Sequence, residues 1–255
     1  MIGTFVAVKT PLAPLLDEPR ASATQISQLL YGHCAKILRR DGAWLHARGG
    51  DGYAGWMHEG YTQTCLEAAF DEWAWGTRGE LSLGCSVRDA GGGTLDLPLG
   101  AVVGSAHRVS GRTLDLDHRR ETFPADPEAI VASASGLFQG SYYQWGGITP
   151  WGTDCSGLVQ SVFALHGIRL PRDASQQALE GENVAGIEEL QPADLLFFSD
   201  REDGKITHVA IAMGASRIVH AALGRGGHRV ENLSRPDDYV GGLMYRFRFA
   251  RRVIA

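Results

Sequence analysis

The sequence predicts a protein of two different halves, an all-β half up to about residue 120 and an α+β half after it. In the first half, short apolar segments alternate with turn signals such as Asp41-Gly42 and Asp51-Gly52. Asp-Gly between alternating runs is a strong sign of a β-hairpin. In the second half, helical apolar patterns precede three apolar runs of strand length, an order typical of an α+β domain.

The composition is that of a globular protein, with 255 residues, 44% of them hydrophobic and 21% charged. A net charge of −5 without long runs of one sign argues against nucleic-acid binding. No stretch approaches the roughly 20 apolar residues of a membrane helix, and the start MIGTFVAVKTPLAPLLDEPR lacks the basic region of a signal peptide. We therefore expect a cytoplasmic protein, or an extracellular or periplasmic one if a leader was removed. The sequence does not indicate the oligomeric state, and a monomer is the expectation.

A weak internal repeat lies in the β-rich half. The segment LLYGHCAKIL resembles LPLGAVVGSA, 68 residues later, and a strand-turn-strand pattern follows each. Two small β-barrels in tandem, at residues 1–66 and 67–122, would explain the similarity. Chance similarity is the alternative.

The second half begins with a helix that Pro127 opens and that extends to about Gly140. Residues 141–152 are aromatic and rich in glycine, so we expect a loop. A second helix begins at Cys155, ends at Gly167 and carries its larger residues at helical spacing. Those residues are Leu158, Val159, Val162, Phe163 and His166. Three strands are then expected within ADLLFFSD, THVAIAMG and RIVHAA.

Cys155 differs from the other three cysteines in its position. Cys34, Cys65 and Cys85 lie in or near apolar, strand-like runs and are expected to be buried. No two of the four cysteines form a CxxC pair, which argues against a structural zinc site. Cys155 lies in the first turn of a helix, after Thr153 or Asp154 as the N-cap residue. Helix N-termini lower thiol pKa values to roughly 3.5–7.5, so Cys155 is a candidate nucleophile, with plain burial as the alternative.

His208 and His220 are candidates for the base that a cysteine nucleophile needs. The segments THVAIAMG and RIVHAA flank GAS, so a hairpin would place His208 opposite residue 220 or 221. If the partner is His220, both rings lie on one face, where one faces the thiol and the other orients it. The alternatives are satisfied core histidines, or a metal site that lacks a clear third ligand. The remaining histidines are expected to be surface or packing residues.

The segments TDCSGLVQSVF, RLPRDASQQ, LQPADLLFF, THVAIAMG and RIVHAA together resemble the NlpC/P60 cysteine peptidases, over roughly residues 125–250. The resemblance implies a papain-like α+β catalytic domain at residues 123–255. It also implies that Cys155 is the nucleophile, His208 the general base and His220 the polar group that orients it. The β-rich half resembles bacterial SH3 domains, on the stretch GDGYAGWMHEGY and the internal repeat.

The same resemblance implies substrate-binding residues. Tyr143 and Trp145 match a tyrosine-x-tryptophan of members that cut free murein peptides, and Asp154 and Ser156 flank the nucleophile. Asp173 fits a carboxylate that binds the amino terminus of the peptide. Core packing, helix capping and a solvated loop charge are the respective alternatives.

The chain departs from the family pattern at two positions. Ala174 stands where the family often has serine directly after the aspartate, so the substrate-binding role of Ser175 is in doubt. Ala193 replaces a common glycine before a strand.

The function that the resemblance implies is hydrolysis of the γ-D-glutamyl–diamino acid bond in murein peptides. The preferred peptide would carry a free amino-terminal L-Ala, as in recycling of wall fragments, and no cofactor or metal is implied. The SH3-like domains would bind wall polymer or close one end of the groove through Tyr53, Trp56 and Tyr61, which could instead be barrel core. Alternatives for the whole chain are a muramoyl-alanine amidase or other acyl-transfer enzyme, and a non-catalytic wall-binding protein.

Overall fold

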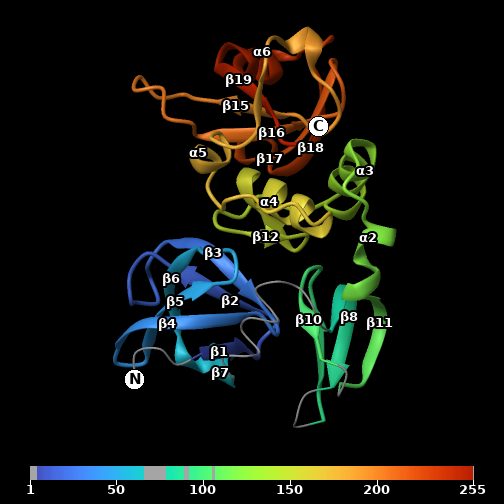
Figure 1. The fold of residues 1–255 in the computed structure, drawn as a ribbon. Coiled ribbons are helices and arrows are strands. Elements are labelled where there is room, and N and C mark those ends of the chain that lie inside the picture. The colour runs from blue at the N-terminus through green and yellow to red at the C-terminus, as the bar shows by residue number, and fades with distance from the viewer. Residues whose placement is uncertain (1–4, 66–78, 89–91, 105–106, 255) are drawn as a thin grey trace. The chain divides into compact units, whose positions relative to one another are not determined.

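The computed structural model describes residues 5–65, 79–88, 92–104 and 107–254. The chain divides into two compact units, which are residues 1–119 with 145–147, and residues 120–144 with 148–255. Figure 1 draws the first unit in blue to green and the second in green to red. The predicted domain boundaries after residues 66 and 122 stay predictions.

A seven-stranded antiparallel sheet opens the first unit, in the order β3-β2-β6-β5-β4-β1-β7. Its elements are β1 (Phe5–Val8), β2 (Leu12–Leu16), β3 (Gln25–Leu30), β4 (Cys34–Asp41), β5 (Trp44–Gly49), β6 (Ala54–His58), the 3₁₀ helix η1 (Glu59–Tyr61) and β7 (Thr62–Cys65). Gly42 and Gly52 both have positive φ, in the turns that join β4 to β5 and β5 to β6. Both hairpins predicted from Asp-Gly are therefore confirmed, because glycine adopts this conformation without steric cost.

The interior of this sheet is apolar and includes Leu15, Leu45 and Met57. Tyr53 and Tyr61 pack against that core, and Trp56 is buried. These positions agree with the barrel-core alternative for the three aromatic residues.

A four-stranded sheet forms the rest of the first unit. Its elements are β8 (Glu80–Arg88), β9 (Thr94–Leu97), β10 (Val102–Val103) and β11 (Val109–Asp115), followed by the 3₁₀ helix η2 (Leu116–His118). β8 is central and pairs with each of the other three strands. A second SH3-like barrel is not confirmed, and residues 67–78 of its predicted span lie outside the described residues.

The internal repeat corresponds to two similar turns. Gly32 and Gly100, at matching positions in the repeat, have φ values of 76° and 91° and precede β4 and β10. The two turns are joined by hydrogen bonds, since Val102 N–H donates to the Tyr31 carbonyl at 3.0 Å. The repeat thus marks a shared turn conformation that requires glycine.

The second unit contains a six-stranded antiparallel sheet in the order β14-β19-β15-β16-β17-β18. Its strands are β14 (Glu182–Val184), β15 (Leu195–Phe198), β16 (His208–Ala212), β17 (Arg217–Ala222), β18 (Gly227–Asn232) and β19 (Phe247–Arg252). The three strands expected from the sequence are β15, β16 and β17. All four residues of β15 are buried, because it lies between β19 and β16 and has both faces covered.

The helices of this unit are α2 (Arg119–Thr122), α3 (Pro127–Leu137), α4 (Cys155–Leu165), α5 (Ala174–Gln177) and α6 (Asp238–Tyr245), with the 3₁₀ helices η3 (Ile187–Glu189) and η4 (Leu223–Arg225). In Figure 1, α4 and α6 lie on opposite sides of the sheet. α4 buries an apolar face that includes Leu158, Val162 and Phe163 against β16 and β17. Gly167 has a φ of 81°, which agrees with its predicted role in ending this helix.

The segment expected to be a loop contains a short hairpin, β12 (Ile148–Thr149) and β13 (Gly152–Thr153). The prediction missed it because two-residue strands carry no periodic pattern. Among the residues that the structure describes, no helix is both long and apolar enough to cross a bilayer.

Candidate active site

Cys155 is the first residue of α4, and Asp154 caps that helix. The Asp154 Oδ1 accepts from the Gly157 N–H at 2.7 Å, which selects Asp154 over Thr153 as the N-cap residue. The Cys155 sulfur is buried and receives hydrogen bonds from the backbone N–H groups of Val209 and Ser156. Val209 directly follows His208 in β16, so the fold brings the thiol to the strand that carries the candidate base.

His208 and His220 contact each other directly. The His208 Nε2 and the His220 Nδ1 are 2.9 Å apart, and the ring centroids lie 5.1 Å apart in an edge-on arrangement. The prediction that both rings share a face is confirmed. The predicted register is wrong, because Ile211 pairs with Val219 and Ala212 with Ile218. Continued along the strands, this register places Ala210 opposite His220 and makes the two histidines diagonal neighbours.

Burial dominates the protonation of the thiol and the imidazole. It raises the pKa of Cys155 to about 12, with the Asp154 carboxylate adding to the increase, while the N–H groups of Val209 and Ser156 oppose it. Burial, followed by the charges of His220 and Arg246, lowers the pKa of His208 well below its usual value. The expectation of a lowered thiol pKa is therefore wrong. Desolvation exceeds the effect of the helix N-terminus and favours the neutral forms of the thiol and the imidazole.

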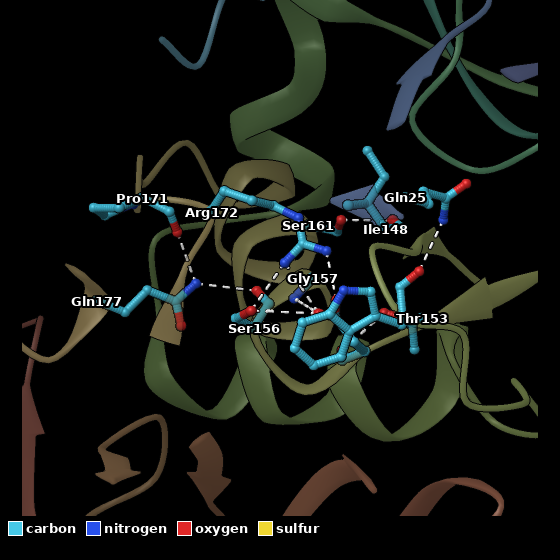
Figure 2. A network of polar contacts seen from close by, with 11 residues as sticks. Gln25, Ile148, Thr153, Ser156, Gly157, Ser161, Pro171, Arg172 and Gln177 are labelled. Atoms are coloured by element: carbon cyan, nitrogen blue, oxygen red, sulfur yellow. Dashed lines mark hydrogen bonds and ion pairs between the residues drawn. The ribbon is translucent and has the colours of Figure 1, made fainter. Parts of the chain in front are cut away.

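Asp154 and Ser156 belong to a buried network around Arg172. Figure 2 shows Ser156, Arg172 and Gln177 of this network. The guanidinium donates from Nη2 to Asp154 Oδ2 at 2.6 Å and from Nη1 to Asp154 Oδ1 at 3.0 Å. Nη1 also donates to the Ser156 hydroxyl at 2.9 Å, and Gln177 Nε2 donates to the Ser156 carbonyl at 3.0 Å. These contacts position the start of α4, and substrate binding by Asp154 and Ser156 stays a prediction.

The other predicted substrate residues occupy different surroundings. Burial, then the charges of Cys155 and Asp154, raises the pKa of Tyr143, so its hydroxyl lies near the candidate nucleophile. Trp145 belongs to the first unit and is 62% exposed. Asp173 precedes α5 and Ser175 lies within it, both half-buried. Their roles in binding stay predictions.

Several other histidines have structural partners. His166 contacts the Pro124 carbonyl and the Ser133 hydroxyl, and His228 contacts the Ala134 carbonyl. These contacts agree with the packing role expected for them. Within the described ranges, no group of three or more His, Cys, Asp or Glu side chains is placed to hold a metal ion.

Glu231 also faces the histidine pair and was not predicted from the sequence. This residue lies in β18, is 9% exposed, and places Oε1 3.7 Å from His220 Nε2. The sequence did contain a sign of this contact. The glycine-rich residues 223–227 indicate a hairpin turn, and the alternation of side chains along its two strands puts His220 and Glu231 on one face.

Comparison with known families agrees with this geometry. Residues 140–239 match the NlpC/P60 family, and this range holds the cysteine and both paired histidines. The second half contains an NlpC/P60 domain. Residues 15–61 match the bacterial dipeptidyl-peptidase SH3 domain. The chain therefore combines an NlpC/P60 domain with a preceding bacterial SH3 domain.

Relatives whose names state an activity match part of this chain. A γ-D-glutamyl-L-lysine dipeptidyl-peptidase of Bacillus subtilis is 38% identical over 92 residues, which are 36% of this chain and 31% of the relative. A γ-DL-glutamyl hydrolase of the same species is 43% identical over 102 residues, 39% of this chain and 24% of the relative. The aligned part thus spans about a third or less of these relatives. A crystal structure of an NlpC/P60 family protein from Bacillus cereus has a TM-score of 0.78 at 20% identity and covers 99% of this chain and 100% of its own, so the fold is shared.

Proposed function

We propose that this chain is a cysteine peptidase that hydrolyses the bond between γ-D-glutamate and a diamino acid in murein peptides. The observation that carries the proposal is the contact of His208 with His220, whose ring nitrogens are 2.9 Å apart. The residue after His208, Val209, donates its N–H to the Cys155 sulfur. The substrate class is supported by relatives named γ-D-glutamyl-L-lysine dipeptidyl-peptidase. The preference for a free amino-terminal L-Ala, the role in recycling and the cytoplasmic location stay predictions from the sequence.

The chemistry begins with a proton transfer. The thiol is neutral at rest, so His208 takes its proton as the sulfur attacks the scissile carbonyl. The His208 Nε2 contacts His220, which leaves Nδ1 as the nitrogen that receives this proton. His208 then gives the proton to the leaving amine. A water molecule transfers a proton to His208 as it attacks the thioester, and that proton returns to the departing sulfur.

The start of α4 offers a donor for the oxyanion of the tetrahedral intermediate. The first intrahelical bond runs from the Leu158 N–H to the Asp154 carbonyl, so the N–H groups before it have no partner within the helix. The Gly157 N–H is bound to Asp154 and the Ser156 N–H to the sulfur. The Cys155 N–H is the group that we assign to the oxyanion.

The test uses defined peptides, L-Ala-γ-D-Glu-meso-diaminopimelate and its L-lysine counterpart, with products identified by mass. We expect release of L-Ala-γ-D-Glu by the wild type and by Cys65→Ala, and no release by Cys155→Ala. Equal cleavage by the Cys155→Ala variant would refute the nucleophile. Release of an intact peptide from a muramoyl-peptide would instead identify an amidase, and wall binding without any product would identify a non-catalytic protein.

A further inference from the structure

His220 has one ring nitrogen whose function the mechanism above does not explain. The residue is 1% exposed, and its Nδ1 contacts His208. Its Nε2 has no hydrogen-bond partner among the residues that the structure describes. The carboxylate of Glu231 is the charge that faces this nitrogen, with Oε1 3.7 Å away. A buried imidazole nitrogen that faces a carboxylate is expected to carry the proton.

The sheet register creates this arrangement. Ile218 pairs with Glu231, and His220 pairs with Arg229, so Glu231 is the diagonal neighbour of His220 on β18. His208 is the diagonal neighbour of His220 on β16. The three side chains therefore form a row across adjacent strands, from the candidate base to a buried carboxylate.

We propose that Glu231 is a positioning residue that holds His220 in the tautomer with its proton on Nε2, a role that rests on the peptidase function proposed above. In this tautomer Nδ1 of His220 is an acceptor, so it receives the Nε2–H of His208. His208 then has an unprotonated Nδ1 and can take the thiol proton. In the opposite tautomer His220 donates from Nδ1, His208 carries its proton on Nδ1, and no base faces the thiol. That arrangement would also turn the lone pair of His220 Nε2 toward the carboxylate, which is repulsive.

Arg225 keeps the carboxylate in place. Its Nε donates to Glu231 Oε1 at 2.7 Å and its Nη2 to Oε2 at 3.2 Å. The interaction with His220, followed by that with Arg225, lowers the pKa of Glu231 despite its burial, so the carboxylate is ionised at neutral pH. Arg225 has a second carboxylate partner in Asp237 and lies 4.3 Å from the centroid of the Tyr239 ring. A guanidinium with this many contacts loses little entropy in holding Glu231.

Other titratable or charged groups surround the histidine pair, and the pH dependence has to be interpreted with all of them. They are Arg229 opposite His220, Tyr239 with its ring 6.3 Å from that of His220, His228, whose pKa His220 lowers, and Arg246, which lowers the pKa of His208. Of the groups named here, Glu231 supplies the negative charge beside His220 Nε2. The effect of its removal on an imidazolium of the pair therefore has a definite sign, because the loss of a nearby negative charge makes that cation less stable.

The first test is independent of activity. Side-chain ¹⁵N NMR of the Cys155→Ala protein reports which ring nitrogen of His220 carries the proton. We expect protonated Nε2 and unprotonated Nδ1 with Glu231 present, and a mixture or reversal in Glu231→Gln. Protonation of His220 on Nδ1 in the Glu231 protein would overturn the proposal, whether or not the chain cleaves murein peptides and whether or not the Gln variant folds.

The second test is kinetic and has a matched control. In the Cys155 enzyme, Glu231→Gln should lower kcat about 10- to 100-fold with little change in KM, because the base loses its orientation and not its substrate. The acid limb of the pH profile should move to lower pH, since the imidazolium loses its counter-charge. Glu188→Gln makes the same substitution at an exposed position of η3 and should leave kcat, KM and the pH profile unchanged. An unshifted acid limb together with a kcat within twofold of the wild type would overturn the positioning role.

Discussion

The buried ion pair of Asp154 and Arg172 permits a quantitative prediction about the start of α4. The two side chains are 8% and 2% exposed, and the guanidinium binds both carboxylate oxygens. The substitution Asp154→Asn removes the negative charge and keeps an oxygen that can still cap the helix at the Gly157 N–H. Its main effect is therefore to remove the carboxylate that binds the buried Arg172 guanidinium at two nitrogens.

Loss of one partner from a buried pair costs about 3–5 kcal/mol. For a protein of this size, about 4 kcal/mol corresponds to a decrease in Tm of roughly 10 °C. Urea and thermal unfolding, followed by circular dichroism, measure both quantities. Asp203→Asn breaks the exposed pair with Arg201 and should leave the midpoint within error of the wild type.

The double variant Asp154→Asn/Arg172→Met separates the charge from the packing. Removal of both charges also eliminates the buried guanidinium that has lost the Asp154 carboxylate, so the double variant should be more stable than Asp154→Asn alone. A loss below about 1 kcal/mol for Asp154→Asn, or a double variant less stable than either single one, would refute the reasoning. In that case the contribution of Asp154 would have to be sought in substrate binding, which peptide kinetics of the same variants would measure.

Three further predictions follow from burial and backbone conformation. Burial lowers the pKa of several histidines, so below about pH 6.5 the unfolded chain binds protons that the native state does not. The free energy of unfolding should therefore fall as the pH decreases, by up to about 1.4 kcal/mol per pH unit for each histidine. Urea titrations at several pH values measure this slope, and His208→Gln should reduce it. Ala193 has a φ of 67°, so Ala193→Gly should raise the free energy of unfolding by about 1 kcal/mol, and a decrease would show that the strain is absent. Burial raises the pKa of Cys155 to about 12, so the rate of its alkylation by iodoacetamide should increase up to pH 10 and beyond. Loss of activity measures this rate. A rapid rate that is constant between pH 6 and 8 would instead indicate a thiolate.

Local patterns predicted much of the second half because they act over short distances. Helical spacing located α4 and the end of that helix at Gly167, and apolar runs located β15, β16 and β17. Strand alternation predicted His208 and His220 on one face for the register that pairs them, and the actual register differs from that one by two residues, which leaves the face unchanged. The other strands of this sheet, β14, β18 and β19, were not predicted, because their sequences are polar and partly exposed, although Phe247 and Phe249 alternate with arginine in β19.

The sequence by itself determined where Cys155, the candidate nucleophile, and the two histidines lie in their own elements, because side-chain direction along a helix or strand depends only on spacing. The tertiary structure alone decided that Arg172 neutralises Asp154, that Glu231 faces His220 and that burial raises the pKa of the Cys155 thiol. Each of these depends on the distance between elements remote in sequence and on the exclusion of water. No local pattern encodes either quantity, because both arise when the chain packs.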